Sequence, residues 1–348
     1  MKTEVLKVTG EEADRAHISK AGDILKKGGL VAIPTETVYG LAANAYSTEA
    51  IDAIFAAKGR PRDNPVIVHV AAFSEISPLV AACPEAARDV CRRFWPGPLT
   101  VIFKKSPLVP DAVSAGLETV AVRCPAHPIA AEVIRAAGVP LAAPSANTSG
   151  RPSATTAAHV LEDMDGKIPL ILDGGPTPVG VESTVLDLSG EAPLVLRPGE
   201  ITLEMLAELL PGVRYDTAVF GKLPEHTPAR SPGTKYTHYA PRGELLLVRG
   251  GAADAMRTIL RLAEGQAGAA VLCYDGEGDA YGGLPAVAFG PAERPDIQAR
   301  KLFGALRELD GLDAKKIYAR LSRQTEGAAA LYNRLLRAAG FQVIEAEG

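Results

Sequence analysis

Short apolar runs and amphipathic stretches alternate along the first two hundred or so residues of the chain. The apolar runs have the length of buried strands and are bounded by Gly, Pro or polar turns, whereas the amphipathic stretches show helical spacing. We predict strands at Leu30–Ile33, Pro65–Ala71, Leu99–Phe103, Thr119–Arg123, Pro140–Ala143, Glu182–Leu188 and Leu194–Arg197, and helices at Glu11–Lys27, around Ile51–Phe55, and at Pro84–Trp95, Ile129–Ala137, Ala154–Met164 and Leu203–Leu210. This order predicts an α/β domain over residues 1–215.

The apolar periodicity lapses between Pro211 and Arg242. This segment contains Ser231–Pro241, which is bounded by prolines but also holds two tyrosines, a histidine and a lysine. A passive tether does not require such residues. We therefore interpret residues 216–243 as a linker that also folds over another part of the protein.

Strand and helix patterns alternate again after the linker. We predict strands at Leu245–Val248, Ala269–Tyr274, Ala286–Phe289, Lys316–Ala319 and Phe341–Ile344, most of them separated by helices at Ala253–Ala263, Ala292–Leu309 and Ala328–Ala339. Such alternation is typical of βαβ units with a largely parallel sheet. Residues 244–348 are therefore predicted to form a smaller, Rossmann-like α/β domain. Gly276 and Gly278 lack the spacing of a dinucleotide-binding fingerprint, so we predict no cofactor there.

Composition and charge narrow the class of protein. A chain of 348 residues with 47% hydrophobic and 22% charged residues is long enough for two globular domains. We see neither a membrane-spanning run nor a signal peptide, so the cytoplasm is the expected location. The net charge of −4 argues against a broad, non-specific nucleic-acid surface. The four cysteines show no metal-binding spacing and are interpreted as reduced, mostly buried thiols.

The chemistry of the chain is concentrated in the basic turn Lys58–Pro65, which follows a helical pattern and precedes a strand. Lys58, Arg60 and Arg62 place three cations in a turn stiffened by Gly and Pro. Lys and Arg side chains bond phosphate oxygens strongly, so this turn is suited to a polyphosphate. The alternative is a solvated basic turn that interacts with the dipole of the preceding helix.

Other polar residues also lie at the ends of predicted elements. The loop Thr35–Gly40 brings hydroxyls and a carboxylate out of a buried strand, as an amino-acid pocket requires, although turn chemistry alone explains threonines there. Arg123 and Arg197 each end a strand. The loop Pro144–Ser153 offers hydroxyls, an amide and a guanidinium before a helix, which suits an anion, and Ser153 is a candidate N-cap. Together these positions predict a polyanion site assembled from scattered elements, without a Walker loop.

Five ordered motifs and the linker resemble the threonylcarbamoyl-AMP synthase family. They are Lys58–Pro65 with His69, Val122–Pro125, Pro144–Gly150, Glu182–Thr184 and Leu196–Gly199, and the linker Ser231–Pro241 is similar to that of the long, two-domain form. The resemblance covers nearly the whole chain and is weakest after Glu244. It implies a YrdC-like twisted, mixed sheet flanked by helices around a positively charged cleft.

The resemblance implies an enzyme that joins L-threonine, bicarbonate or CO2, and ATP. The products are threonylcarbamoyl-adenylate and pyrophosphate, and this is the first step in modifying the adenosine beside the anticodon of certain tRNAs. Other proteins then transfer the activated group to tRNA. Direct contact of this chain with RNA is expected to be weak, and no membrane partner is implied.

Site residues follow by matching the motifs. Lys58, Arg62 and Arg197 would hold the ATP phosphates, and Lys58 and Arg62 would be the catalytic residues. Further ATP contacts would come from Ser145, Asn147, Ser153, Thr119, Tyr236 and Tyr239. The threonine subsite would be lined by Thr35, His69, Arg123, Ala143 and Ser183, with Arg123 facing the substrate carboxylate. The linker is placed against the nucleotide as a lid. Mg2+ is expected to arrive on the phosphates of ATP, because the sequence shows no dedicated carboxylate cage.

No catalytic protein nucleophile is evident, and the implied reaction needs none, because nucleotidyl transfer depends on positioning and charge stabilisation. Two alternatives stand beside this prediction. A carbamoyl-transfer domain of hydrogenase-maturation proteins shares several of the motifs, but it normally accompanies zinc-binding cysteine pairs and an acylphosphatase-like segment, which we do not find. A non-catalytic RNA-binding module is disfavoured by the net acidity and by the lack of aromatics interleaved on a basic face.

Overall fold

The computed structural model describes residues 2–221, 238–321 and 328–346, which form two compact units. Unit 1 holds the described residues up to Val219 except Gly150–Pro152. Unit 2 holds Gly150–Pro152, residues 220–221 and the described residues from His238 onward. Residues 231–237 of the predicted lid, including Tyr236, lie outside the described part of the chain. In the described residues, no helix is long and apolar enough to cross a membrane.

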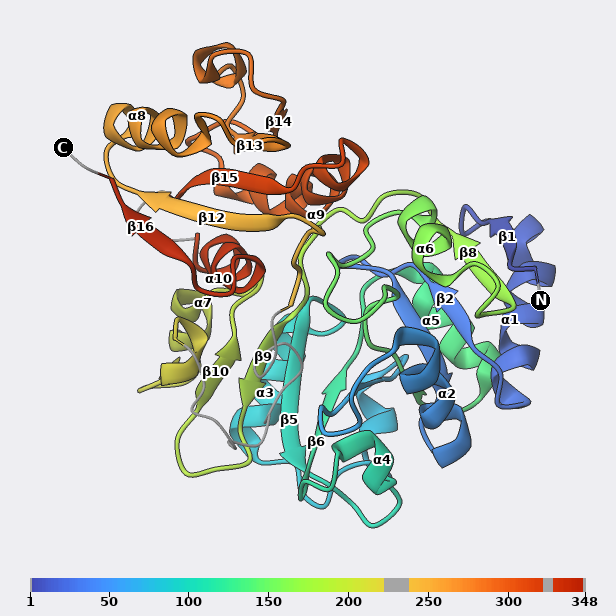
Figure 1. The fold of residues 1–348 in the computed structure, drawn as a ribbon. Helices are drawn as coiled ribbons and strands as arrows, with labels where there is room; N and C mark the ends of the chain where they lie inside the picture. Colours follow the sequence, from blue (N-terminus) through green and yellow to red (C-terminus); the bar gives the residue numbers. More distant parts are fainter. Residues whose placement is uncertain (1, 222–237, 322–327, 347–348) are drawn as a thin grey trace. The chain divides into compact units, whose positions relative to one another are not determined.

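Unit 1 is built on a mixed sheet of eleven strands (Figure 1). In spatial order they are β1 (Glu4–Lys7), β8 (Leu170–Asp173), β2 (Val31–Ile33), β3 (Gly40–Asn44), β7 (Leu141–Ala142), β4 (Ile67–His69), β6 (Thr119–Arg123), β5 (Leu99–Lys104), β9 (Thr184–Asp187), β10 (Leu194–Arg197) and β11 (Arg214–Tyr215). Parallel and antiparallel pairs are interspersed: β4 runs parallel to β6 and antiparallel to β7. The predicted mixed sheet is confirmed.

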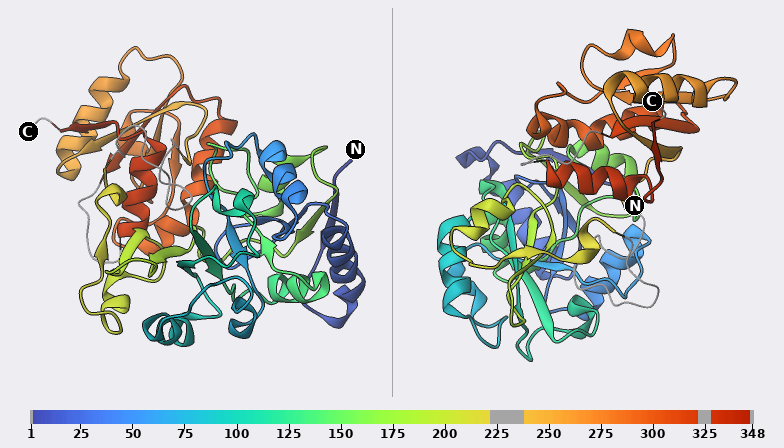
Figure 2. Two further views of the ribbon diagram at one scale, coloured as in Figure 1. Left: turned by 90° about the horizontal axis from the view of Figure 1, so that it is seen from below. Right: turned by 90° about the vertical axis from the view of Figure 1, so that its left-hand side faces the viewer.

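The helices of unit 1 lie on both sides of this sheet (Figure 2). They are α1 (Arg15–Lys26), α2 (Thr48–Lys58), α3 (Glu85–Phe94), α4 (Asp111–Ser114), α5 (Pro128–Ala137), α6 (Ala157–Met164) and α7 (Leu203–Ala207), with short 3-10 turns η1 (Glu12–Asp14), η2 (Phe73–Ile76) and η3 (Thr217–Val219). Helix α1 packs closely on α5: a Cβ added at Gly22 would lie 2.8 Å from the Cβ of Ala136. Glycine is therefore required at that crossing.

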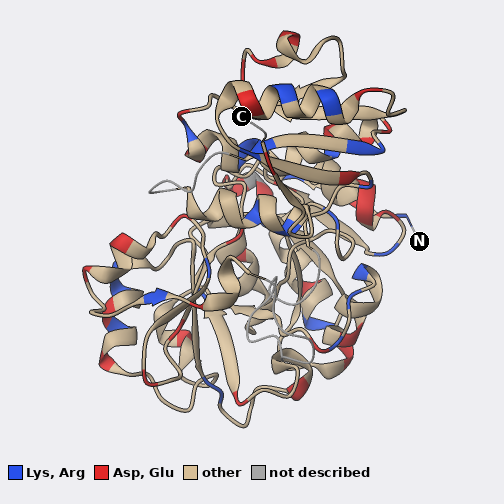
Figure 3. Ribbon diagram, turned by 60° about the vertical axis from the view of Figure 1, so that its left-hand side comes forward, with Lys and Arg blue, Asp and Glu red and all other residues tan. Residues whose placement is uncertain are grey.

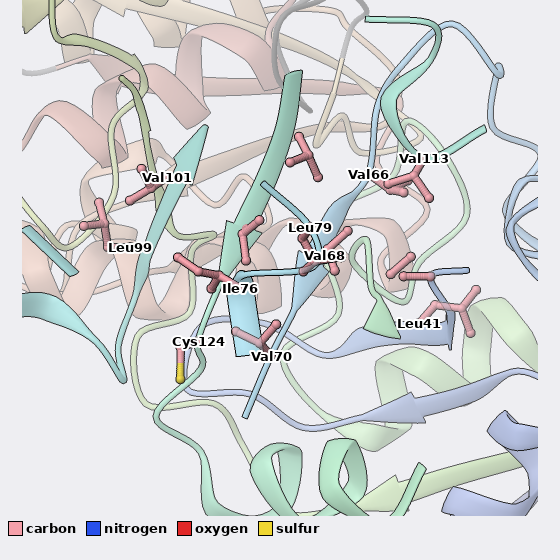
Figure 4. Packing of buried hydrophobic residues seen from close by; sticks show 14 of the residues in the cluster. Leu41, Val66, Val68, Val70, Ile76, Leu79, Leu99, Val101, Val113 and Cys124 are labelled. Atoms are coloured by element: carbon pink, nitrogen blue, oxygen red, sulfur yellow. The ribbon is translucent and has the colours of Figure 1, made fainter. Parts of the chain in front are cut away.

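Strand alternation divides the core of unit 1 between the two faces of the sheet. In β2, Ala32 packs in the large cluster with α2, α3 and α6, while its neighbours Val31 and Ile33 pack in the cluster with α1 and α5. Successive side chains of a strand point to opposite faces, so one short run serves both layers. Figure 4 shows part of the large cluster, where Val66, Val68 and Val101 contact residues from the surrounding elements.

One face of the strands β4, β6, β5, β9 and β10 carries a separate apolar cluster, smaller than the two described above. This small apolar cluster consists of Ile67, Ile102, Ala121, Val185 and Leu196, with Leu194 packed against it, and all of these are strand residues. Because side chains alternate, the polar residues that share this face are those two positions away. The sheet therefore carries a polar row beside the small cluster, and the candidate site is built there.

Unit 2 contains a five-stranded sheet in which every pair is parallel, in the order β14-β13-β15-β12-β16. Its elements are β12 (Glu244–Arg249), α8 (Ala252–Ala263), β13 (Ala269–Cys273), η4 (Gly278–Tyr281), β14 (Ala286–Ala288), α9 (Pro295–Gly311), β15 (Lys316–Leu321), α10 (Ala329–Ala338) and β16 (Val343–Glu345). The predicted Rossmann-like domain is confirmed, with boundaries that differ by a few residues.

The sequence patterns missed four strands of unit 1: β1, β3, β8 and β11. Strand β3 lies within Gly40–Asn44, where glycine, alanine and a polar loop before it gave no β-branched run. Strand β1 has an exposed, mixed pattern, because it lies at the edge of the sheet. The helix predicted to begin at Ala154 begins instead at Ala157.

Charged residues of both signs are interspersed along the helices and loops, while most of the strands carry few charges (Figure 3). This distribution agrees with the small net charge of −4. All four cysteines are free thiols; Cys91, Cys124 and Cys273 are buried and Cys83 is partly exposed. Burial raises the pKa of the Cys124 thiol to about 11, so this thiol stays protonated and inert at neutral pH.

Candidate active site

Strand register brings His69 and Arg123 together. The two residues are direct partners on the parallel strands β4 and β6, and Thr100 of β5 lies opposite Arg123 on the other side. All three are almost fully buried. They come from three separate segments of the chain, so only the pairing of the strands makes them neighbours. The sequence prediction that His69 and Arg123 share one subsite agrees with this geometry.

The Arg123 guanidinium is held from three sides. Its Nε donates to the Gly97 carbonyl at 3.2 Å, and Nη1 donates to the Thr37 hydroxyl at 2.8 Å. Nη2 lies 2.8 Å from Oε1 of Glu36 in a buried ion pair. A guanidinium carries five N–H donors, of which two make these hydrogen bonds; Nη2 makes the ion pair but has no hydrogen-bond partner among the described residues, so its donors remain. Arg123 is thus fixed in place and still has capacity for a carboxylate.

A chain of hydroxyls continues from Arg123 into the loop after β2. The Thr37 hydroxyl, which accepts from Arg123, lies 2.9 Å from the Thr35 hydroxyl, and Thr35 donates to the Val38 carbonyl at 2.6 Å. The same loop is anchored from outside, because Val179 donates its backbone N–H to the Glu36 carbonyl. Thr35, predicted to contact threonine, therefore lies on a rigid loop beside Arg123.

Ser183 and Arg197 are joined directly. Arg197 donates from Nε to the Ser183 carbonyl at 3.0 Å and from Nη2 to the Ser183 hydroxyl at 3.1 Å. The same hydroxyl lies 2.8 Å from that of Thr100. Gly199 allows this close approach, because a Cβ there would lie 2.4 Å from the Thr184 backbone nitrogen. A residue predicted to bind ATP phosphate is therefore in contact with one predicted to bind threonine.

Lys58 ends α2 and is almost fully buried. Its Nζ donates to the backbone carbonyls of Ser145 and Asn147, both at 2.5 Å, and its own carbonyl accepts from the Ser149 N–H at 2.8 Å. Burial, followed by the neighbouring Arg60, lowers the pKa of the Lys58 ammonium well below its ordinary value. Lys58 therefore shapes the loop that contains Ser145 and Asn147, two predicted ATP contacts.

Ser153 does not cap the following helix, and that alternative for this residue is wrong. Helix α6 is capped by Thr156, whose hydroxyl accepts from the His159 N–H at 3.2 Å. The Ser153 hydroxyl instead donates to Oε1 of Glu182 at 2.5 Å in the buried interior. The chain adds three residues between Ser153 and the first helical turn, so its side chain is free to link the loop to the Glu182–Thr184 motif.

The remaining predicted residues take no part in the side-chain contacts described above. Arg62 has a side chain 71% exposed and pairs with Asp52 at 3.1 Å. Thr119 lies at the opposite end of β6 from Arg123, on the same face, and Ala143 is a buried residue just after β7. Tyr239 belongs to unit 2, where its ring stacks on Phe303 with centroids 5.1 Å apart.

Electrostatics at the polar face depend on burial. Burial and the Arg123 charge lower the pKa of His69 to about 3, so its imidazole is neutral at physiological pH. Burial raises the pKa of Glu36, but the Arg123 charge and the Ala126 N–H outweigh it, and the net pKa is lowered. Burial raises the pKa of Glu200, whose carboxyl is in the field of both Glu36 and Arg123.

Glu36, Thr37, Thr100 and Glu182 hold the predicted residues in place, although none of the four was predicted individually as a site residue. Glu36 and Thr37 supply the carboxylate and a hydroxyl of the polar loop that was predicted to suit an amino-acid pocket. Thr100 gave no signal, because a threonine in a strand is common. In the described part of the chain, no group of three or more His, Cys, Asp or Glu side chains could hold a metal ion.

The mixed sheet with its polar face, together with the parallel sheet of unit 2, defines a two-domain α/β protein of the YrdC-like type. Two family models match it: one described as Telomere recombination covers residues 23–199, and one described as Threonylcarbamoyl-AMP synthase, C-terminal domain, covers residues 201–340. The chain belongs to the threonylcarbamoyl-AMP synthase family.

Relatives match over almost the full length of the chain. Threonylcarbamoyl-AMP synthase of Pyrococcus abyssi is 42% identical over 341 residues, which are 96% of this chain and 97% of that protein. The Bacillus subtilis protein of the same name is 43% identical over 332 residues, 94% of each chain. The structure of Pyrococcus abyssi Sua5 complexed with L-threonine has a TM-score of 0.90 at 42% identity, covering 99% of this chain and 100% of that one.

Proposed function

We propose that this protein adenylates N-carboxythreonine, using L-threonine, bicarbonate or CO2, and ATP. A carbamate oxygen attacks the α-phosphorus, a P–O bond forms, and the bond to the leaving pyrophosphate breaks. The observation that carries the proposal is the polar face on which Arg123, His69 and Ser183 converge, with Ser183 bonded to Arg197, a residue suited to phosphate. Membership of the family and the threonine complex of the Pyrococcus relative support it.

In this proposal the amino acid lies at the Arg123 end of the face. Two N–H donors of Arg123 bind the substrate carboxylate, and Thr35, Ser183 and neutral His69 surround the rest of the molecule. A charged imidazole would repel the guanidinium beside it, so a neutral His69 suits this role. Because Arg123 is almost fully buried, its contact with a carboxylate acts in a low dielectric and is correspondingly strong.

ATP is proposed to lie along the loop that Lys58 shapes. Arg197 supplies positive charge next to Ser183, and Ser145, Asn147 and Ser153 supply hydroxyl and amide contacts. Positioning of the carbamate in line with the leaving group is the main contribution of the protein, because the transfer requires no covalent intermediate. Arg62, which is exposed and paired with Asp52, is proposed to swing onto the phosphates when the nucleotide binds.

Mg2+ is proposed to enter with ATP. A polyphosphate binds the ion with its own oxygens, and Mg2+ is commonly held by substrate phosphates together with water. The activated product is proposed to pass to other proteins that complete the modification of tRNA. We propose at most a weak direct contact with RNA, given the mixed surface charge.

The deciding experiment is pyrophosphate release by the full chain with threonine, bicarbonate and Mg-ATP, with the adenylate identified by mass. We expect release to require all three substrates and to stop when threonine is omitted. Arg123→Ala is the site-directed control. Carbamoyl phosphate is added in place of bicarbonate in a parallel reaction, and adenylate formed from it without threonine would favour the hydrogenase-maturation type of chemistry instead.

A further inference from the structure

The Glu36 carboxylate is bonded unevenly. Oε1 receives the Ala126 backbone N–H at 3.0 Å and lies 2.8 Å from Nη2 of Arg123. Oε2 is buried and has no hydrogen-bond partner among the described residues. Glu36 as a whole is only 8% exposed. One oxygen of this carboxylate is therefore committed to the protein and the other retains its full capacity to accept.

A buried carboxylate oxygen without a donor is costly, because the water that would solvate it has been removed. The rest of the Glu36 environment stabilises the charged form: the Arg123 charge and the Ala126 N–H hold its pKa below the ordinary value. The carboxylate is consequently an anion at neutral pH. An anionic oxygen of this kind binds a cationic N–H donor most strongly.

The position of Glu36 relates it to the amino-acid subsite. It stands between Thr35 and Thr37, and it touches the guanidinium proposed to bind the substrate carboxylate. Its charge also influences His69, the strand partner of Arg123. An α-amino acid presents an ammonium and a carboxylate on the same carbon. Adjacent Glu36 and Arg123 present the two complementary charges at one place, whereas an arginine alone would serve any carboxylate.

We propose that Oε2 of Glu36 accepts a hydrogen bond from the α-ammonium group of threonine, and from the carbamate N–H once that nitrogen has been carboxylated. Glu36 is then the residue that selects an α-amino acid over an acid lacking the amino group. This inference rests on the proposed function, since it assigns a contact within the same amino-acid subsite. Glu36 is not the acceptor of the ammonium proton, because a carboxylate stabilised as an anion is a weak base.

The test compares two ligands in binding titrations that need no turnover. L-threonine carries the ammonium, and (R)-3-hydroxybutyrate keeps the carboxylate, hydroxyl and methyl groups but has hydrogen in place of the amino group. We expect Glu36→Gln to weaken threonine binding about tenfold to a hundredfold, the worth of a charge-assisted hydrogen bond. Binding of (R)-3-hydroxybutyrate should change less than twofold, so the preference for threonine should collapse.

Equal weakening of both ligands would overturn the proposal, since it would mean that Glu36 acts only by holding Arg123. No change for either ligand would also overturn it. Glu200→Gln is the matched control, because its partly buried carboxyl is in the field of the same pair while the residue as a whole is exposed; it should alter threonine binding less than twofold. If the melting temperature of Glu36→Gln is below that of the wild type, Glu36→Asp is titrated with the same two ligands. It should show the same loss of threonine binding without a matching loss of (R)-3-hydroxybutyrate binding.

Failure of this proposal is distinguishable from failure of the proposed function. Wild-type pyrophosphate release with threonine tests the reaction, whereas the two titrations test the ammonium contact alone. A wild-type enzyme that turns over, with a Gln variant that still prefers threonine, refutes only the role of Glu36. A protein that binds threonine selectively through Glu36 but releases no pyrophosphate keeps this contact and refutes the reaction.

Discussion

Arg197 donates two hydrogen bonds to Ser183, one to its carbonyl and one to its hydroxyl, at 3.0 and 3.1 Å. This places a residue from the end of β10 against the start of β9, across a bulge in the pairing of the two strands. The two side chains were predicted separately, one for ATP and one for threonine. If the proposed function holds, this contact connects the two predicted subsites.

Substitution of Arg197 should consequently affect both substrates. Arg197→Lys keeps the charge but cannot bond the carbonyl and the hydroxyl of Ser183 together, because a lysine lacks the planar fork. We expect KM to rise several-fold for threonine as well as for ATP, measured by pyrophosphate release. A variant with a raised KM for ATP alone would contradict the connection. Thr100→Val, which removes the other partner of the Ser183 hydroxyl, should raise only the KM for threonine.

Arg123→Ala should abolish recognition of the substrate carboxylate and leave Glu36 buried without its partner. Loss of a buried, hydrogen-bonded charge contact typically costs about 3–5 kcal/mol, so kcat/KM for threonine should fall at least a hundredfold. In the wild type, kcat/KM for serine, which lacks only the methyl group, should be lower than that for threonine by roughly ten- to two-hundredfold. Both amino acids should lose activity in Arg123→Ala; an unchanged threonine dependence would contradict the assignment.

Substitutions of Lys58 and Arg62 should differ in their effect on the stability of the protein, even if both residues support turnover. Lys58→Met leaves two buried carbonyls without a donor, at about 1–3 kcal/mol each, and should lower the melting temperature as well as turnover. Arg62→Ala removes an exposed ion pair worth about 1 kcal/mol or less and should leave melting nearly unchanged. If Arg62→Ala nevertheless reduces turnover about a hundredfold, the contact of Arg62 with phosphate is supported. Unchanged turnover would indicate that Arg62 is only a solvated surface residue.

His69 should make stability depend on pH in the acid range. Its pKa is about 3 in the folded protein against 6.5 for an ordinary histidine, so between these values the unfolded chain binds a proton that the folded one does not. The free energy of unfolding should therefore fall as pH falls from 6.5 to 3, by about 1.4 kcal/mol per pH unit from this group. The free energy of unfolding, measured by denaturant titration at a series of pH values, should fall more steeply with falling pH in the wild type than in His69→Asn, by that amount per pH unit. An equal pH dependence of the two proteins would show that His69 takes up its proton in the folded state as readily as in the unfolded chain.

Ser153 and Thr156 provide a matched pair of hydroxyls. Thr156→Ala removes the N-cap of α6 and should cost about 1 kcal/mol of stability, with little effect on the KM for ATP. Ser153→Ala removes the contact with Glu182 and should raise the KM for ATP while leaving the helix intact. Melting curves and ATP titrations of the two variants separate these roles. If Ser153→Ala lowers the stability instead and Thr156→Ala raises the KM for ATP, Ser153 is the N-cap after all.

Much of this architecture is readable from local patterns. Apolar runs between turn residues gave β5, β6 and β10 nearly residue by residue, and the alternation after Glu244 gave the parallel sheet of unit 2. These elements are predictable because burial of a strand or helix face imposes a period on its own residues. The motifs around Lys58, Arg123 and Ser145 were also visible, since each places charged or hydroxyl side chains directly at the end of such an element.

What the tertiary structure decided was which of these side chains meet. Register alone sets His69 beside Arg123 and Thr100 opposite it, although 54 and 23 positions of sequence separate them from Arg123. The partner of Ser153 and the pairing of Glu36 likewise depend on loops brought together from distant segments. A one-dimensional pattern records whether a residue is buried or exposed. It does not record cross-strand distance, because backbone hydrogen bonds are the same for every residue and do not select a partner strand. The choice of partner and register depends on turn geometry and on burial of side chains across the whole sheet.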